Sequence, residues 1–275
     1  MFVQRQIQVY FSKFSRMLMS TKGLFFLLEA IFLPLVVSFV FQPGSAFVKY
    51  SDTEMACFTF VSAAVWIGLF NSILSICSER QVVKFEYVMK GLSIPSYLAA
   101  RILTELWLCF LEAFLMTMVI VWRYAILQNS LFFFGMLLLT LFIVLFAADM
   151  MSLLISSIVK KTNQAMTVMP IVLIVQLIFS NFIKNLDGLS KIIGFISNLT
   201  FTKWGGEALF RTANIMSNVS VLGNKESIVL AGDKVNTYVF SGLHVVKCWI
   251  IILVLASVCV CLASLVLKNV KKDAR

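Results

Sequence analysis

Four ionisable residues lie inside stretches that are otherwise apolar, where a charged group could do chemistry. Arg101 and Glu105 are four residues apart, Glu112 lies further along the same stretch, and Asp149 lies in the next one. On a helix, Arg101 and Glu105 can pair, and Glu112 falls on the same face as Glu105. A charge at the centre of a bilayer costs about 2.5–3.5 kcal/mol and therefore has a partner or a purpose. The Arg101–Glu105 pair is expected to be structural. Glu112 and Asp149 are expected near mid-membrane, where they could face each other or share a polar partner, and three interpretations stand for them: an internal polar network, a proton site or a substrate contact.

A second group of residues that could do chemistry lies in the most charged stretch of the chain, residues 78–97. Glu79 and Glu86 are seven residues apart and share one helix face, and Lys90 follows Glu86 in the favourable order at i,i+4. Gly91 can end this helix, because glycine readily adopts the conformation that follows a last helical turn. The stretch is either a solvated loop whose charges pair with each other, or a docking element for a cytoplasmic partner.

Several kinds of site are absent from the sequence. None of the 12 glycines is followed by lysine, so no P-loop is present and ATP hydrolysis by this chain is excluded. His244 is the only histidine, which rules out a multi-histidine metal site in one copy. The six cysteines lie within or beside apolar stretches and are expected to pack as small apolar side chains. We expect no catalytic residue, no metal ligands and no cofactor bound by this chain.

The elements that position these residues are helices long enough to cross a membrane. Of 275 residues, 60% are hydrophobic and 13% charged, against about 45–50% and 25% in soluble domains. A spanning helix needs about 20 apolar residues. Six stretches qualify, at 23–41, 56–76, 99–122, 131–158, 166–183 and 239–267. We predict an all-α membrane protein with a single domain, residues 1–275, which excludes a soluble enzyme.

The distribution of Lys and Arg predicts that both termini are cytoplasmic. The two short loops on the opposite side hold only Lys49 and Arg123, whereas the N-terminus, the 78–97 loop, positions 160–161 and the C-terminus are rich in basic residues. The net charge of +10 then reflects this topology and contact with anionic lipid, so no nucleic-acid partner is expected. Glu29, six residues into the first span, is expected to pair with a basic group at the cytoplasmic side.

Two segments outside the spans also have an apolar periodicity. Residues 1–22 combine apolar residues at helical spacing with basic ones, which predicts an amphipathic helix in the membrane interface. It is either an anchor for the first span or a receiver of force from a partner. The external segment 184–238 contains an apolar stripe that predicts a re-entrant or interfacial helix between spans five and six. The stripe consists of Leu189, Ile192, Ile193 and Ile196.

Two motifs resemble ABC transporter permeases of the type-2 class, most closely the ABCG-like transmembrane domain. The first is the order Glu79, Phe85-Glu86-Tyr87, Gly91, Tyr97, Ala100-Arg101 and Glu105, which resembles the family's coupling-helix region. The second is residues 197–210, which resemble the stretch after the family's fifth span. There Trp204, Glu207, Ala208 and Leu209 match, and Phe201 stands where proline is usual. The sequence lacks the fused nucleotide-binding domain and outer-loop cysteines of eukaryotic members, which favours a bacterial permease subunit in the plasma membrane.

The resemblance implies a transporter made of two permease chains, as a homodimer or a heterodimer, and two separate ABC ATPase subunits that bind ATP and Mg. Closure of the ATPases would push on the N-terminal helix and on the coupling helix. The expected ATPase contacts are Glu79, Arg80, Lys84, Glu86, Tyr87 and Lys90, with loop 159–165 as a weaker contact. Spans two and five would line the substrate cavity with Ile67, Phe70, Asn71, Leu74, Val172, Val175, Gln176 and Phe179.

The leading hypothesis is an ATP-driven exporter of a hydrophobic or amphipathic compound such as a peptide, a lipid or a drug. An ion-coupled secondary carrier that uses Glu112 and Asp149 is an alternative. The sequence shows no inverted repeats with paired broken helices, which such carriers usually have. A membrane immunity or anchor protein is a third possibility.

Overall fold

The computed structural model describes residues 2–18, 21–43, 46–47, 50–89, 91–124, 131–182, 190–213 and 241–268. Within these ranges the regular structure is helical and contains no strand, which confirms the predicted all-α class. The helices are α1 (Phe2–Leu18), α2 (Thr21–Val40), α3 (Tyr50–Ser72), α4 (Ser75–Met89), α5 (Ile94–Tyr124), α6 (Leu131–Ile158), α7 (Thr162–Ile178), α8 (Lys191–Asn198), α9 (Phe201–Thr212) and α13 (Gly242–Lys268).

Four helical stretches of the described chain are long and apolar enough to cross a membrane. They are Ser51–Met89, Ile94–Tyr124, Phe132–Ile158 and Gly242–Lys268. Two shorter apolar helices, Phe25–Val40 and Thr162–Ile178, coincide with the predicted first and fifth spans. The described apolar helices thus fall where the sequence predicts spans, and the six-span layout itself stays a prediction.

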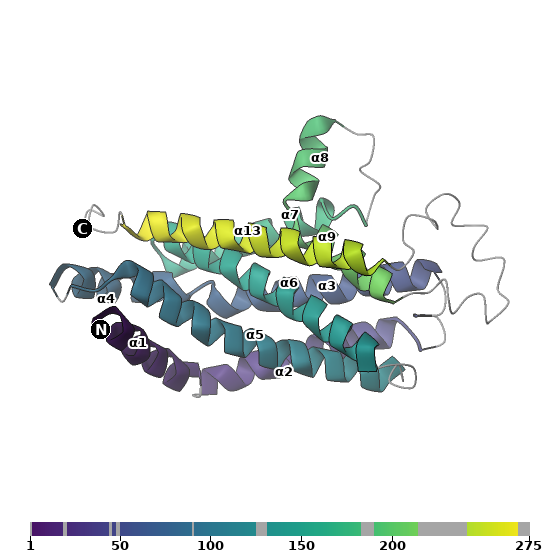
Figure 1. Cartoon of the computed structure of the whole chain (residues 1–275), viewed down its shortest axis with the longest axis horizontal. Helices are drawn as coiled ribbons and strands as arrows, with labels where there is room; N and C mark the ends of the chain where they lie inside the picture. Colours follow the sequence, from purple (N-terminus) through teal and green to yellow (C-terminus); the bar gives the residue numbers. More distant parts are fainter. Residues whose placement is uncertain are drawn as a thin grey trace.

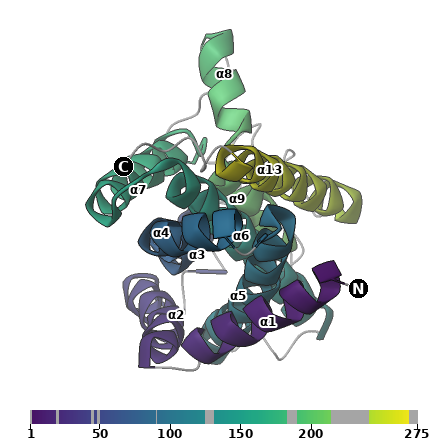
Figure 2. The same cartoon turned by 90° about the vertical axis from the view of Figure 1, so that its left-hand side faces the viewer.

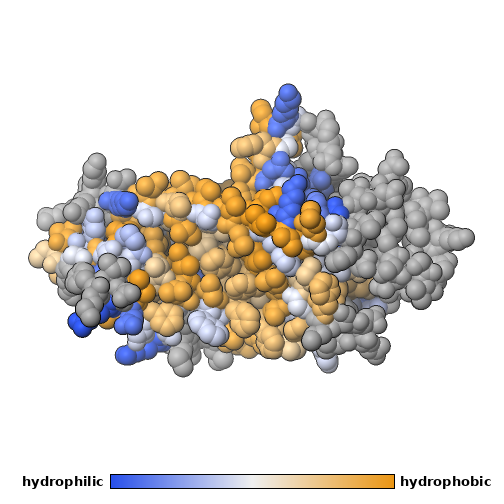
Figure 3. Space-filling view, viewed as in Figure 1, coloured by the Kyte–Doolittle hydropathy of each residue, from blue (hydrophilic) through white to orange (hydrophobic). Residues whose placement is uncertain are grey.

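The long helices run side by side, with α6 at the centre of the bundle (Figure 1). Helix α6 packs mainly against α3, α13 and α5. Viewed along the bundle, α1 and α2 lie on one side, α7 and α13 on the other, and α8 projects away from it (Figure 2). Apolar residues cover the middle of the face in Figure 3, and hydrophilic residues gather toward the α4 end and around α8 and α9. An apolar middle region of this kind is the surface that a bilayer would surround.

Helices α3 and α6 approach unusually closely at Gly68. A Cβ added there would lie 2.5 Å from the Leu145 carbonyl oxygen and 2.9 Å from the Ala148 Cβ. Only glycine therefore fits this contact without moving the helices. The contact lies beside Asp149, whose backbone nitrogen would be 3.1 Å from the added Cβ.

The end of α6 and the start of α4 cap each other. The backbone amides of Ile76 and Cys77 both donate to Ser156 Oγ, at 3.0 Å each. In return, Arg80 Nη1 donates to the carbonyl oxygens of Ser157 at 2.7 Å and Val159 at 3.3 Å. A cation at the carboxyl end of α6 satisfies carbonyls that have no partner within the helix. These contacts hold α4 in a fixed position relative to α6.

The other end of α4 lies where the sequence predicts it. Gly91 has φ of 65°, a left-handed conformation that glycine adopts at little cost. The amide of Leu92 donates back to the Glu86 carbonyl at 3.2 Å. Helix α5 then begins at Ile94, with Pro95 in its first turn, where a missing N–H is tolerated. Helix α4 occupies the first part of the predicted stretch 78–97 and begins slightly earlier, at Ser75.

Candidate functional site

The first candidate site is the junction where α1 crosses the tip of α4, which we call the α1–α4 junction. Gln6 Nε2 donates to the Gly91 carbonyl at 3.4 Å, and Gln6 Oε1 accepts from the Ser93 amide at 3.2 Å. One turn later, Tyr10 donates its phenol hydrogen to Glu86 Oε2 at 2.6 Å. Three residues further, Lys13 Nζ lies 3.5 Å from Glu79 Oε2.

These three residues of α1 share one face, because they are spaced by four and then three residues. Burial, together with the hydrogen bond and the negative charge of Glu86, raises the pKa of Tyr10 well above its ordinary value. These effects favour the protonated phenol, which is the form that donates to Glu86. The α1–α4 junction thus joins α1 to both the tip and the middle of α4.

An aromatic cluster anchors the same face of α1 to the first turns of α5. Tyr97 packs edge-on against Tyr10 and Phe14, with ring centroids 5.8 and 5.6 Å apart. The Arg101 guanidinium lies 4.9 Å from the centroid of the Phe14 ring. Phe14 and Tyr97 are almost completely buried. Aromatic pairs and cation–π contacts of this kind are stronger when they are shielded from water. Helix α1 is therefore packed firmly against α5.

The predicted ATPase contacts occupy different environments on α4. Glu79 and Glu86 face α1, and Arg80 caps α6. Lys84 and Tyr87 are partly buried and have partners of their own. Lys90 lies outside the described residues. The structure therefore does not bring the five described residues of this set together on one exposed surface.

Part of the exposed surface of α4 is apolar, and the sequence interpretation missed it. Phe85 is 56% and Met89 68% exposed. Val82 and Val88 are about half exposed on the same helix. Their spacing of three and four residues is the signal that could have found them. We call these four residues the α4 apolar face.

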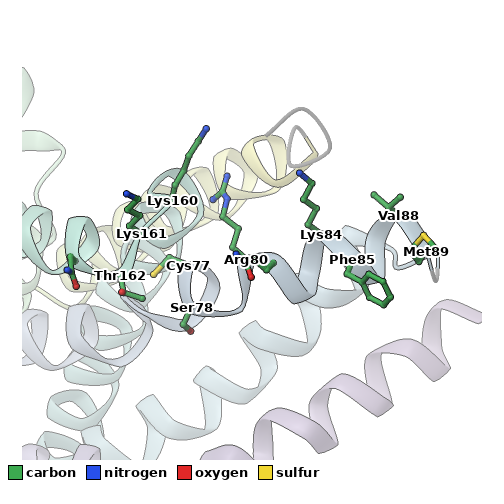
Figure 4. A pocket seen from close by; sticks show the side chains of 12 residues that line it. Cys77, Ser78, Arg80, Lys84, Phe85, Val88, Met89, Lys160, Lys161 and Thr162 are labelled. Carbon is green, nitrogen blue, oxygen red and sulfur yellow. The ribbon is translucent and has the colours of Figure 1, made fainter. Parts of the chain in front are cut away.

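A groove with a volume of about 1150 Å³ lies between α4 and the start of α7. Its lining includes four basic residues, Arg80, Lys84, Lys160 and Lys161, together with Phe85, Val88 and Met89. None of the described residues that line it is acidic. Lys84, Arg80 and Lys160 point to the same side in Figure 4, and Phe85 projects away from them. The structure therefore places the predicted weaker contact, loop 159–165, beside α4.

The second candidate site is a buried polar network between α3, α5 and α6. Asn71 Nδ2 donates to Glu112 Oε2 at 2.8 Å, and Arg101 Nε lies 2.9 Å from Glu105 Oε1. Asp149 is completely buried. Among the residues that the structure describes, neither carboxyl oxygen of Asp149 has a hydrogen-bond partner. The network brings together the four residues that the sequence singled out.

The pairing within this network is more specific than the sequence could predict. Glu112 has Asn71 of α3 as its polar partner. Asp149 lies near Glu105 and Ser72. The Glu29 side chain lies near Trp66 of α3. The expected pairing of Glu29 with a basic group at the cytoplasmic side is not present among the described side chains.

The predicted cavity residues divide into buried and outward-facing groups. Ile67 and Asn71 are buried, and Gln176 accepts a hydrogen bond from the Phe201 amide at 2.8 Å. Gln176 thereby joins α7 to the start of α9 and does not face an open space. Phe70, Leu74, Val172 and Phe179 are half-buried, whereas Val175 is exposed. Val175 belongs to an outward-facing apolar stripe of α7 with Ile171, Ile174 and Ile178.

The comparisons with known proteins give one family match. A family model described as ABC-2 type transporter matches residues 4–213. This range includes both the α1–α4 junction and the buried polar network, and it ends before α13. The search of curated proteins gives no match.

Proposed function

The chain belongs to the ABC-2 type transporter family, and we propose that it is the permease subunit of an ATP-driven exporter. It is a multi-pass membrane protein. The observation that carries the finer proposal is the α1–α4 junction, together with the apolar face that α4 leaves exposed. A permease driven by another chain needs a surface that receives movement and contacts that pass it on. Helix α4 meets both requirements.

In this proposal a separate ABC ATPase, which holds ATP and Mg, docks on the α4 apolar face and on the basic groove beside it. Movement of α4 would reach α1 through Glu86 and Glu79, which contact Tyr10 and Lys13. It would reach α6 through Arg80. The role proposed for Glu79, Arg80 and Glu86 therefore changes from direct ATPase contact to transmission within the chain.

The proposed topology has six spans, formed by α2, α3, α5, α6, α7 and α13. At 1.5 Å per residue, the 20 residues of α2 reach about 30 Å, the thickness of the hydrocarbon core. Helix α1 lies in the cytoplasmic interface, and α8 belongs to the external segment. The described start of α1 and the end of α13 lie at the α4 end of the bundle (Figure 1), which supports cytoplasmic termini. The proposed location is a bacterial plasma membrane.

A second permease chain, identical or homologous, would cover the apolar stripe of α7. Ile171, Ile174, Val175 and Ile178 are exposed there, and α8 projects from the same side with Ile192 and Phe195 exposed. The cavity for a hydrophobic or amphipathic substrate would then form between the two copies. Among the predicted lining residues, the partly exposed Phe70, Leu74, Val172, Val175 and Phe179 fit this position best.

An ion-coupled carrier is the second candidate, because Glu105, Glu112 and Asp149 are buried close together. Buried carboxyl groups in spanning helices often mark proton or ion pathways. Transport that requires an ion gradient and proceeds without any ATPase would favour this function over the exporter.

The test of the exporter proposal is co-purification with the partner ATPase. We expect the double variant Phe85→Asp/Met89→Asp to lose the ATPase, because two charges replace the apolar docking surface. Phe132→Asp is the matched control, since Phe132 is similarly exposed but lies at the start of α6, whose other end contacts α4. Retention of the ATPase by the double variant, or its absence from the unmodified chain, would contradict the proposal.

A further inference from the structure

Three side chains with metal-binding atoms meet where α9 packs on the first turns of α13. They are Glu207 of α9 and His244 and Cys248 of α13. Their carboxylate oxygen, ring nitrogen and sulfur all lie within 4.8 Å of one another. His244 Nε2 and Glu207 Oε2 are 3.3 Å apart. His244 and Cys248 are four residues apart and so share one face of α13.

We propose that Glu207, His244 and Cys248 form a zinc site on the outer side of the protein. Zinc binds carboxylate oxygen and imidazole nitrogen at about 2.0–2.2 Å and thiolate sulfur at about 2.3 Å. A tetrahedral ion with these bonds holds its ligand atoms about 3.3–3.8 Å apart. The His244–Glu207 pair is already at this separation. The Cys248 sulfur would have to move closer to the other two ligand atoms by about 1 Å at most, and side-chain rotation allows such a movement.

The charge of the three ligands balances that of the ion. A thiolate and a carboxylate together neutralise a divalent cation, and a neutral imidazole adds no charge. Arg211 and Lys247 lie close to Cys248. A site with a net positive charge would be repelled by these cations, whereas a neutral site is not.

The mixed ligand set selects the class of metal. Calcium and magnesium prefer oxygen ligands only, so an imidazole and a thiol exclude them. Sites with three protein ligands leave a fourth position for water. Cys248 is completely buried, whereas the side chains of Glu207 and His244 are 14% and 28% exposed. Water therefore has access on the side of the carboxylate and the imidazole.

The surrounding helices are positioned to hold the ligands. Trp249, next to Cys248, donates from Nε1 to Thr140 Oγ1 at 3.1 Å, which fixes the rotation of α13 against α6. Ala208, next to Glu207, packs against Val245 and Cys248. A bound zinc ion ties α9 to α13 across a sequence separation of 37 residues. The family match ends at residue 213, so it includes neither ligand of α13, and the site does not depend on the proposed export.

The experiment measures zinc binding to the full chain, purified in detergent and equilibrated with zinc chloride alone. We expect one zinc ion per chain at micromolar free zinc. His244→Ala and Cys248→Ser should each weaken binding by more than about 100-fold, because loss of even an outer partner typically weakens it 10–100-fold. Cys261→Ser is the matched control, since Cys261 lies on the same helix but is exposed, and it should bind zinc as the unmodified chain does.

Cobalt provides a second readout, which reports directly whether a thiolate is among the ligands. Cobalt bound by a thiolate has a charge-transfer band in the near ultraviolet. We expect this band in the unmodified chain and in Cys261→Ser, and its loss in Cys248→Ser. Absence of zinc binding by the unmodified chain would overturn the proposal. Unchanged zinc affinity in both His244→Ala and Cys248→Ser would also overturn it.

Discussion

The α1–α4 junction and the buried polar network use similar residue types in different surroundings. In the junction, Glu79 and Glu86 are partly accessible to solvent and each contacts one residue of α1. In the network, Glu105, Glu112 and Asp149 are buried between packed helices. Polar groups at a surface can exchange their partner for water, but buried groups cannot. We therefore expect the contacts between α1 and α4 to exchange partners more readily than those of the network.

The largest loss of stability is expected at Gly68, where the helices around the polar network are packed most tightly. Gly68→Ala should destabilise the protein by about 1–3 kcal/mol, because its Cβ would overlap the Leu145 carbonyl oxygen. Thermal unfolding in detergent measures this loss. Gly135→Ala on α6 is the control, since nothing lies within 4 Å of an added Cβ there. It should be neutral or stabilising by about 0.5–1 kcal/mol. Equal stability of the two variants would show that α3 and α6 are not in close contact.

A smaller loss of stability is expected from Asn71→Leu, which removes the hydrogen-bond donor to Glu112. Hydrogen bonds between spanning helices contribute about 0.6–1.7 kcal/mol, and we expect a destabilisation of about 1–2 kcal/mol. The double variant Asn71→Leu/Glu112→Leu should lose less stability than the sum of the single variants, because it leaves no unpaired group. Strict additivity of the two single losses would mean that Asn71 and Glu112 do not interact.

The smallest effect on stability is expected in the α1–α4 junction. Tyr10→Phe keeps the aromatic packing and removes only the hydrogen bond to Glu86, so the loss should stay below about 1.5 kcal/mol. Lys13→Met should cost less than about 1 kcal/mol, because the ion pair with Glu79 is partly exposed. Unfolding curves of both variants provide the comparison. A loss as large as that of Gly68→Ala would contradict the distinction between the two regions.

The sequence predicted the features that depend on local spacing. The charged helix, its end at Gly91 and the positions of the apolar helices follow from hydrophobic periodicity and from glycine chemistry. The partners of these residues could not be predicted, because they depend on how helices pack. Tyr10 and Glu86, for example, are separated by 76 residues.

The exposed surfaces were harder to predict than the helices. The α4 apolar face was missed because the sequence interpretation relied on the charged residues of the same helix. Most of those charged residues contact other helices of the bundle. The cluster of Glu207, His244 and Cys248 was missed because a search for several histidines does not detect a mixed ligand set. Helix α9 lies within the external segment and α13 follows that segment, so only the folded chain brings the three side chains together.

The central claim is that movement of α4 reaches α1 through Glu86 and Tyr10. Hydrogen–deuterium exchange on the complex with the partner ATPase, with and without ATP and Mg, tests it most directly. We predict that ATP changes the exchange of both α4 and α1 in the unmodified protein. In Glu86→Arg, α4 should still respond, and the response of α1 should be lost. An undiminished response of α1 in Glu86→Arg would contradict the claim.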